Sequence, residues 1–272
     1  SALSQSNTNG GLNYLTLGFP LKTDVWTMSF GLMPYSNVSY NVIAATPVVN
    51  RDEALASYQY EGNGGINQVY MSNGWQIVPG FLYLGARVGY AFGSITNETV
   101  INIDEESFTI IGEDTLVSTK DFKTSNFFRS TRYSDFLVEG GLYMKKRIGE
   151  TLDVNLGIVY ELAANMRTKR DEKITVVDRL NPNPPTDDIL TESEGKTLLP
   201  AKYGVGLSLS KEFKWALGVD FYSRDWSKFE SDFESEESMT NSYKIILGVE
   251  FTPDFFSATS YFKRISYQLG LN

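Results

Sequence analysis

The chain has 272 residues, of which 42% are hydrophobic and 21% are charged, and its formal net charge is -9. It contains no cysteine and no histidine, which excludes disulfides, thiolate or histidine zinc sites, and catalysis by Ser-His or Asp-His pairs. The acidic balance also argues against a nucleic-acid partner. We therefore expect neither an enzyme nor a nucleic-acid-binding protein, and no cofactor.

Alternation of large apolar residues with small or polar ones predicts β-strands along the chain. An early run places Trp26, Met28 and Phe30 on one side of a strand. The clearest run, FLYLGARVGYAFGS, has apolar side chains at every second position from Leu82 to Phe92. A period of two sends alternate side chains to opposite faces of a strand. Further runs of this kind cover residues 136–144, 152–162, 202–209, 215–222, 243–251 and 265–271.

These runs are close to ten residues long, and their polar face carries glycine and isolated charges. Membrane-spanning barrel strands need about 9–11 residues, with only every second one apolar. The alternative is a soluble β-sandwich, whose strands average about 5–6 residues. The longer runs favour the membrane barrel.

The connections between these strands alternate between short and long. Short ones fall at residues 21–24, 78–80, 147–150 and 210–214, with a slightly longer one at 252–260. Long polar stretches cover residues 34–65, 95–133, 163–200 and 223–241. Outer-membrane barrels have short periplasmic turns and long extracellular loops. We expect the long stretches to lie outside the cell and to include extensions of the strands, as at residues 101–111 and 121–130.

The sequence thus predicts an all-β fold, an antiparallel transmembrane β-barrel with about ten strands, in a single domain over residues 1–272. Its expected location is the bacterial outer membrane, as an integral protein. Outer-membrane lipids and lipopolysaccharide are the expected partners of such a surface.

Charged residues recur on the polar face of the predicted strands, which would face the barrel lumen. They are Arg87, Glu139, Lys145, Asp153, Glu161, Lys202, Asp220, Lys244 and Glu250. Two interpretations are open: a path for a ligand or ion, and a network of mutually paired charges that fills a narrow lumen. We favour the paired network, because an isolated charge is costly to bury.

Aromatic and acidic clusters supply two further hypotheses. Tyr222, Trp226 and Phe229 are predicted to belong to an aromatic belt at the membrane interface. Clustered carboxylates could hold Ca²⁺, although solvated loops are the favoured interpretation. These carboxylates are Asp104, Glu105, Glu106, Glu113, Asp114, Glu230, Asp232, Glu234, Glu236 and Glu237.

Two late segments and one early segment carry motifs of a known kind. Residues 199–229 have a Leu-Pro start and then Asp225-Trp226-Ser227 with Phe229. Residues 248–271 have a Gly-x-Glu-aromatic-x-Pro pattern, followed by Arg264 and a glycine-containing strand. The early segment, YEGNGGINQVYMSNGW, has a glycine-rich strand opening. With these motifs the chain resembles the FadL-type family of outer-membrane transporters, in its Bacteroidota-like branch.

This resemblance implies a barrel of fourteen strands with an N-terminal plug, and passive uptake of a hydrophobic, fatty-acid-like small molecule. The chain lacks the family's Asn-Pro-Ala plug motif and has too few strands, so we expect it to be incomplete at one or both ends. The alternative function is that of a non-transporting barrel subunit, bound to other outer-membrane proteins in a complex for export, assembly or nutrient uptake.

Overall fold

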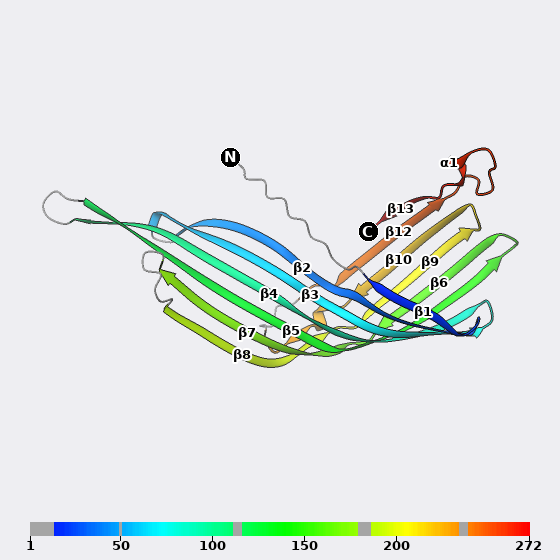
Figure 1. The fold of residues 1–272 in the computed structure, drawn as a ribbon, viewed down its shortest axis with the longest axis horizontal. Coiled ribbons are helices and arrows are strands. Elements are labelled where there is room, and N and C mark those ends of the chain that lie inside the picture. The colour runs from blue at the N-terminus through cyan, green and yellow to red at the C-terminus, as the bar shows by residue number, and fades with distance from the viewer. Residues whose placement is uncertain (1–13, 49–50, 111–115, 179–185, 234–238) are drawn as a thin grey trace.

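The computed structural model describes residues 14–48, 51–110, 116–178, 186–233 and 239–272. Nearly all of them belong to one antiparallel β-sheet that curls along its length (Figure 1). The strands are β1 (Leu15–Lys22), β2 (Trp26–Val48), β3 (Arg51–Val78), β4 (Leu82–Ile110), β5 (Leu116–Ile148), β6 (Leu152–Glu161), β7 (Ala164–Asp178), β8 (Thr186–Leu199), β9 (Lys202–Lys211), β10 (Trp215–Arg224), β11 (Glu230–Ser231), β12 (Ser242–Phe251) and β13 (Tyr267–Leu271). Two short helices, η1 (Trp226–Lys228) and α1 (Tyr261–Arg264), lie in the last connections.

The main path of the sheet runs β1-β2-β3-β4-β5-β6-β9-β10-β12-β13, which agrees with the expected number of about ten strands. Every pairing on this path is antiparallel. Within the described ranges, β1 pairs only with β2 and β13 only with β12, so these two strands form the edges. No helix among the described residues is long and apolar enough to cross a membrane.

Strand lengths divide the sheet into two parts. Strands β6, β9, β10 and β12 have 10 residues each, whereas β4 has 29 and β5 has 33. The long strands extend past the ends of the short ones, together with β7 and β8 (Figure 1). Strand β7 pairs with the portion of β5 that β6 leaves free, and β8 pairs with β7. We call this projecting part the extension. It consists of the portions of β2–β5 that lie beyond the short strands, together with β7 and β8.

Most of the predicted long loops are therefore paired strands. Polar side chains predominate in them and interrupt any regular apolar alternation, but the strands pair directly across the sheet. The Asn126 amide donates to Glu98 at 2.6 Å, and Arg129 pairs with Glu172 at 2.7 Å. Cross-strand polar and charged pairs of this kind stabilise a sheet without any apolar face.

The convex face of the short-strand part is apolar. One row of directly opposed residues crosses β2 to β12 and contains no polar side chain. Its members are Trp26, Trp75, Leu84, Leu142, Ile158, Val205, Phe221 and Ile245. Most of the large side chains on this face are solvent-exposed, as for Val205 at 43% and Ile245 at 58%.

The same face becomes charged where the extension begins. Arg132, Lys169 and Glu194 occupy opposed positions on β5, β7 and β8. They lie only a few residues beyond Phe136, which is still 57% exposed on the apolar part. The convex face thus has an apolar band with a sharp polar border on the side of the extension.

Candidate functional site

A row of charged residues crosses the concave face of the sheet. Arg87 opposes Glu139, Glu139 opposes Glu161, Glu161 opposes Lys202, and Lys202 opposes Arg224. Directly opposed residues of antiparallel strands point to the same face, with Cβ atoms about 4.5–5.5 Å apart. Strands β4, β5, β6, β9 and β10 therefore place these side chains side by side. We call this set the charged row.

The two carboxylates of the charged row are both neutralised by neighbours. Arg87 pairs with Glu139, and Arg224 pairs with Glu161. Lys202 lies between the carboxylates, with its Nζ 3.8 Å from Glu139 Oε2 and 3.4 Å from Glu161 Oε2. The Glu161 side chain is only 4% exposed. Burial of such a carboxylate is costly unless several donors compensate for its lost hydration.

Tyr35 connects the charged row to the opposite side of the curl. Its hydroxyl donates to Glu161 Oε1 at 2.8 Å and accepts from Arg224 Nη2 at 2.7 Å. Tyr35 belongs to β2, and β3, β4 and β5 separate it from Glu161 on β6 within the sheet. These hydrogen bonds therefore cross the concave side.

A β-bulge explains how Tyr35 reaches this position. The register between β2 and β3 shifts between Pro34 and Ser36, which leaves Tyr35 without an opposed partner. An extra residue of this kind bends the strand and re-aims its side chain. Met33, next to the bulge, also approaches the charged row, with its Sδ 3.9 Å from Arg87 Nη1.

An apolar cluster lies beside the charged row, toward the extension. Its buried members are Ile66, Ala91, Leu137, Met166 and Leu199. Tyr35 and Trp226 pack against it, and Trp226 is held by a 2.9 Å hydrogen bond from its Nε1 to Ser242 Oγ. The Arg224 guanidinium lies 5.4 Å from the Trp226 ring. Charged row, Tyr35 and apolar cluster together cross the concave side at one level.

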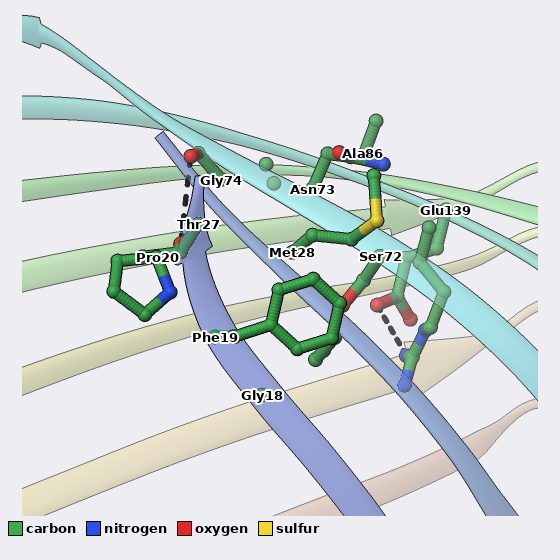
Figure 2. A pocket seen from close by; sticks show the side chains of 14 residues that line it. Gly18, Phe19, Pro20, Thr27, Met28, Ser72, Asn73, Gly74, Ala86 and Glu139 are labelled. Carbon is green, nitrogen blue, oxygen red and sulfur yellow. Dashed lines mark hydrogen bonds and ion pairs between the residues drawn. The ribbon is translucent and has the colours of Figure 1, made fainter. Parts of the chain in front are cut away.

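Cavities adjoin this level on both sides. One of about 600 Å³ faces the short turns and ends at Arg87 and Glu139. Figure 2 shows Phe19, Met28 and Glu139 around it. Another of about 660 Å³ lies beside the bridge itself, lined by Tyr35, Arg224 and Trp226 together with part of the apolar cluster.

Lys145 and Asp153 form a second charged group near the short turns. Arg147 binds Asp153 through two hydrogen bonds, at 2.7 and 2.8 Å, and Lys145 Nζ lies 3.8 Å from the same carboxylate. The sequence analysis placed Arg147 in a turn and did not include it. The structure extends β5 to Ile148, so Arg147 is the last charged residue of the strand.

The remaining predicted lumen residues stay apart from both charged groups. Asp220 opposes Gly206, Lys244 opposes Tyr222, and Glu250 accepts a 2.8 Å hydrogen bond from Gln268. By register, all three share the concave face with Arg224. Within the described ranges, no three acidic side chains gather as a cation site. Of the acidic clusters, Glu113, Asp114, Glu234, Glu236 and Glu237 lie outside the described residues.

The three residues assigned to an aromatic belt are close together. Tyr222 is on the concave face with Arg224, and Trp226 packs against the apolar cluster, with the ring of Phe229 at 5.9 Å. Asp225, just before Trp226, accepts a 2.5 Å hydrogen bond from Ser227, which holds the pKa of Asp225 below its usual range. Contact of these aromatics with a membrane interface stays a prediction.

Sequence reasoning missed two central residues of the site. Arg224 continues the period of two from Asp220 and Tyr222, so extending that strand by one step would have found it. Tyr35 could not be found in this way, because a bulge breaks the period at that position.

Comparison with known proteins corrects the family assignment. No curated protein and no solved structure matches the chain. The sequence model of the BamG family, in contrast, matches residues 1–272. BamG is a family distinct from the FadL-type transporters, so the assignment based on residues 199–229 and 248–271 was wrong. The chain belongs to the BamG family.

Proposed function

We propose that the chain is an integral outer-membrane β-barrel protein that acts as a non-transporting subunit of a complex with other outer-membrane proteins. The family match supports a role in a complex more than a role as an uptake channel. The fold supports the membrane location through the apolar band on its convex face, and the bridge across the concave side supports the absence of transport.

The dimensions of the apolar band fit a bilayer. Along β4 it extends from Leu82 to Phe92, about 33 Å at roughly 3.3 Å per residue. With the strand tilt of roughly 40° typical of such barrels, it spans about 25 Å across the membrane. The charged border at Arg132 and Lys169 would then lie in the headgroup region, and the extension outside the membrane.

The observation that carries the proposal is the bridge from Tyr35 to Glu161 and Arg224. It ties β2 to β6 and β10 across the concave side, with the apolar cluster directly beside it. A transported molecule would have to separate these buried hydrogen bonds and ion pairs. Breaking a buried pair costs about 3–5 kcal/mol.

Purification of the chain from outer membranes in mild detergent tests the proposal. We expect a particle well above the 30.5 kDa mass of the chain, with at least one other outer-membrane protein in fixed stoichiometry. A chain that runs alone, and that carries hydrophobic solutes into vesicles, would support the transport function instead.

A further inference from the structure

Exposed aromatic side chains gather at the short-turn end of the sheet. They are Phe213, Phe255, Phe256, Tyr261 and Phe262. Phe256, Tyr261 and Phe262 are 74%, 69% and 72% exposed, unusually high values for rings of this size. The Phe213 ring lies 4.9 Å from that of Phe255 and 5.3 Å from that of Phe256. We call this set the aromatic cap.

The backbone conformation of Phe213 is a second reason, besides exposure, to look for a function of the aromatic cap. Three short turns are each closed by the same kind of backbone hydrogen bond, 3.0 Å long. The bonds run from Val25 N to Lys22 O, from Phe81 N to Val78 O, and from Lys214 N to Lys211 O. The third residues of these turns have positive φ: 60° at Asp24, 69° at Gly80 and 58° at Phe213. Bulky residues are strained in this region, where Gly, Asn and Asp are favoured. Strain that persists at one position is a reason to look for a function of its side chain.

The loop from β12 to β13 holds the other rings in an ordered frame. Its backbone is fixed by hydrogen bonds from Thr252 N to Lys214 O at 2.7 Å and from Asp254 N to Lys263 O at 2.8 Å. Thr252 is 3% exposed, and its hydroxyl lies 2.7 Å from that of Ser266. A surface ordered in advance loses less conformational entropy when it binds.

Cations surround the aromatic cap. Lys214, Lys263 and Arg264 are all exposed, and the Arg264 guanidinium lies 5.7 Å from the Tyr261 ring. Among the residues that the structure describes, none of the three pairs with a carboxylate. The chain as a whole, in contrast, has a net charge of -9.

The cap is also continuous with the apolar band. Trp215 and Phe251 form the last opposed pair of β10 and β12, and the turn and the loop follow directly. Aromatic rings next to apolar surface and free cations match the boundary between hydrocarbon and anionic headgroups. We propose that the aromatic cap and its cations bind anionic phospholipid at the short-turn side of the membrane. This inference rests on the proposed membrane location.

The absence of cysteine allows a direct test with a fluorescent label on single-cysteine variants. The chain is reconstituted into phosphatidylcholine vesicles, with or without phosphatidylglycerol, that carry a lipid quencher at the headgroup or deep in the acyl chains. For Phe256→Cys we expect stronger quenching by the shallow quencher, and at least a twofold increase with phosphatidylglycerol. Leu207→Cys, in the apolar band, should be quenched by the deep quencher, and Leu190→Cys, on the extension, by neither.

The outcomes separate the two proposals. If the Leu207→Cys label is not quenched, the membrane location itself is wrong. If that label is quenched but the Phe256→Cys label stays open to an aqueous quencher, only the lipid inference is overturned. Protection of the Phe256→Cys label in native outer membranes but not in vesicles would instead identify a protein as the occupant, and would also overturn it.

Charge variants test the choice of lipid. Lys263→Gln combined with Arg264→Gln should abolish the effect of phosphatidylglycerol on the Phe256→Cys label and leave quenching at Leu207→Cys unchanged. Lys196→Gln, which removes an exposed cation from the extension, is the matched control and should change neither signal. An undiminished phosphatidylglycerol effect in the double variant would contradict the role of the cations.

Discussion

At the scale of single residues, Glu161 is the centre of the site. Its carboxylate binds the Tyr35 hydroxyl, the Arg224 guanidinium and, at 3.4 Å, the Lys202 ammonium group. Each donor comes from a different strand. Removal of one donor leaves a buried carboxylate with incomplete compensation, which is far more costly than the loss of an exposed ion pair.

Arg224→Ala should therefore lower the free energy of unfolding by about 3–5 kcal/mol, because it leaves Glu161 buried without its guanidinium partner. Urea titration in detergent micelles measures the change. Arg132→Ala is the matched control, since it removes an exposed guanidinium that pairs with Asp171 at 2.5 Å, and it should cost at most about 1 kcal/mol. Equal effects of the two substitutions would contradict the buried network.

Tyr35→Phe removes one hydroxyl and keeps the ring against the apolar cluster. Glu161 and Arg224 would each lose a hydrogen bond, so we expect a destabilisation of about 1–3 kcal/mol in the same titration. Tyr40→Phe serves as control, because the Tyr40 hydroxyl makes an exposed 3.0 Å hydrogen bond to Asn97. If Tyr40→Phe costs as much as Tyr35→Phe, the Tyr35 bridge is not the stabilising element that the geometry indicates.

Phe213→Gly should separate stability from lipid binding. Glycine adopts positive φ without strain, so the variant should be more stable than the parent chain by about 1 kcal/mol. The loss of the ring should at the same time weaken shallow quenching at Phe256→Cys. Asp24→Gly, at the same place in a sister turn, should leave that quenching unchanged. A destabilised Phe213→Gly variant would show that the ring is needed for packing rather than strained.

At the scale of elements, the apolar alternation predicted the short strands well. The period of two in residues 82–92 identified the apolar face of β4, and the same pattern found β6, β9, β10 and β12. Part of the extension, residues 101–111 and 121–130, was predicted as strand. Most of β7 and β8 was not, because residues such as Lys169 and Glu194 form no continuous apolar side. Cross-strand partners in these strands are distant in sequence, so their pairing is not visible in any local pattern.

The site was predictable only to the extent that strand periodicity held. Arg87, Glu139, Glu161 and Lys202 were all placed on one face of the sheet, because each lies within a regular alternating run. Which charges would pair could not be deduced, since this depends on the register between strands. The bulge at Tyr35 has one local cue, Pro34, because proline inside a strand is typical of an edge or a bulge, but this cue does not say which side chain the bulge re-aims.

Amide hydrogen exchange tests the extension as an element. If residues 94–102 and 124–134 form the paired ladder of β4 and β5, their amides should exchange at least about 100-fold more slowly than those of an open loop. The amides of β6 provide an internal reference for a paired strand. Exchange at the rate of an unstructured peptide would contradict the paired ladder of the extension.

At the scale of the whole molecule, one sheet combines three surfaces. The convex apolar band fits lipid, the polar extension fits water, and the concave side is bridged where the charged row meets the apolar cluster. The aromatic cap adds a fourth surface at the short-turn end. This division fits the proposed role as a membrane-anchored subunit of a complex.

Solute flux through vesicles that contain the purified chain tests the central claim most directly. If the bridge between Tyr35, Glu161 and Arg224 closes the concave side, small solutes should enter these vesicles no faster than they enter empty ones. The Leu207→Cys label confirms in the same preparation that the chain is inserted. Flux that rises in proportion to the amount of inserted chain would contradict a non-transporting subunit.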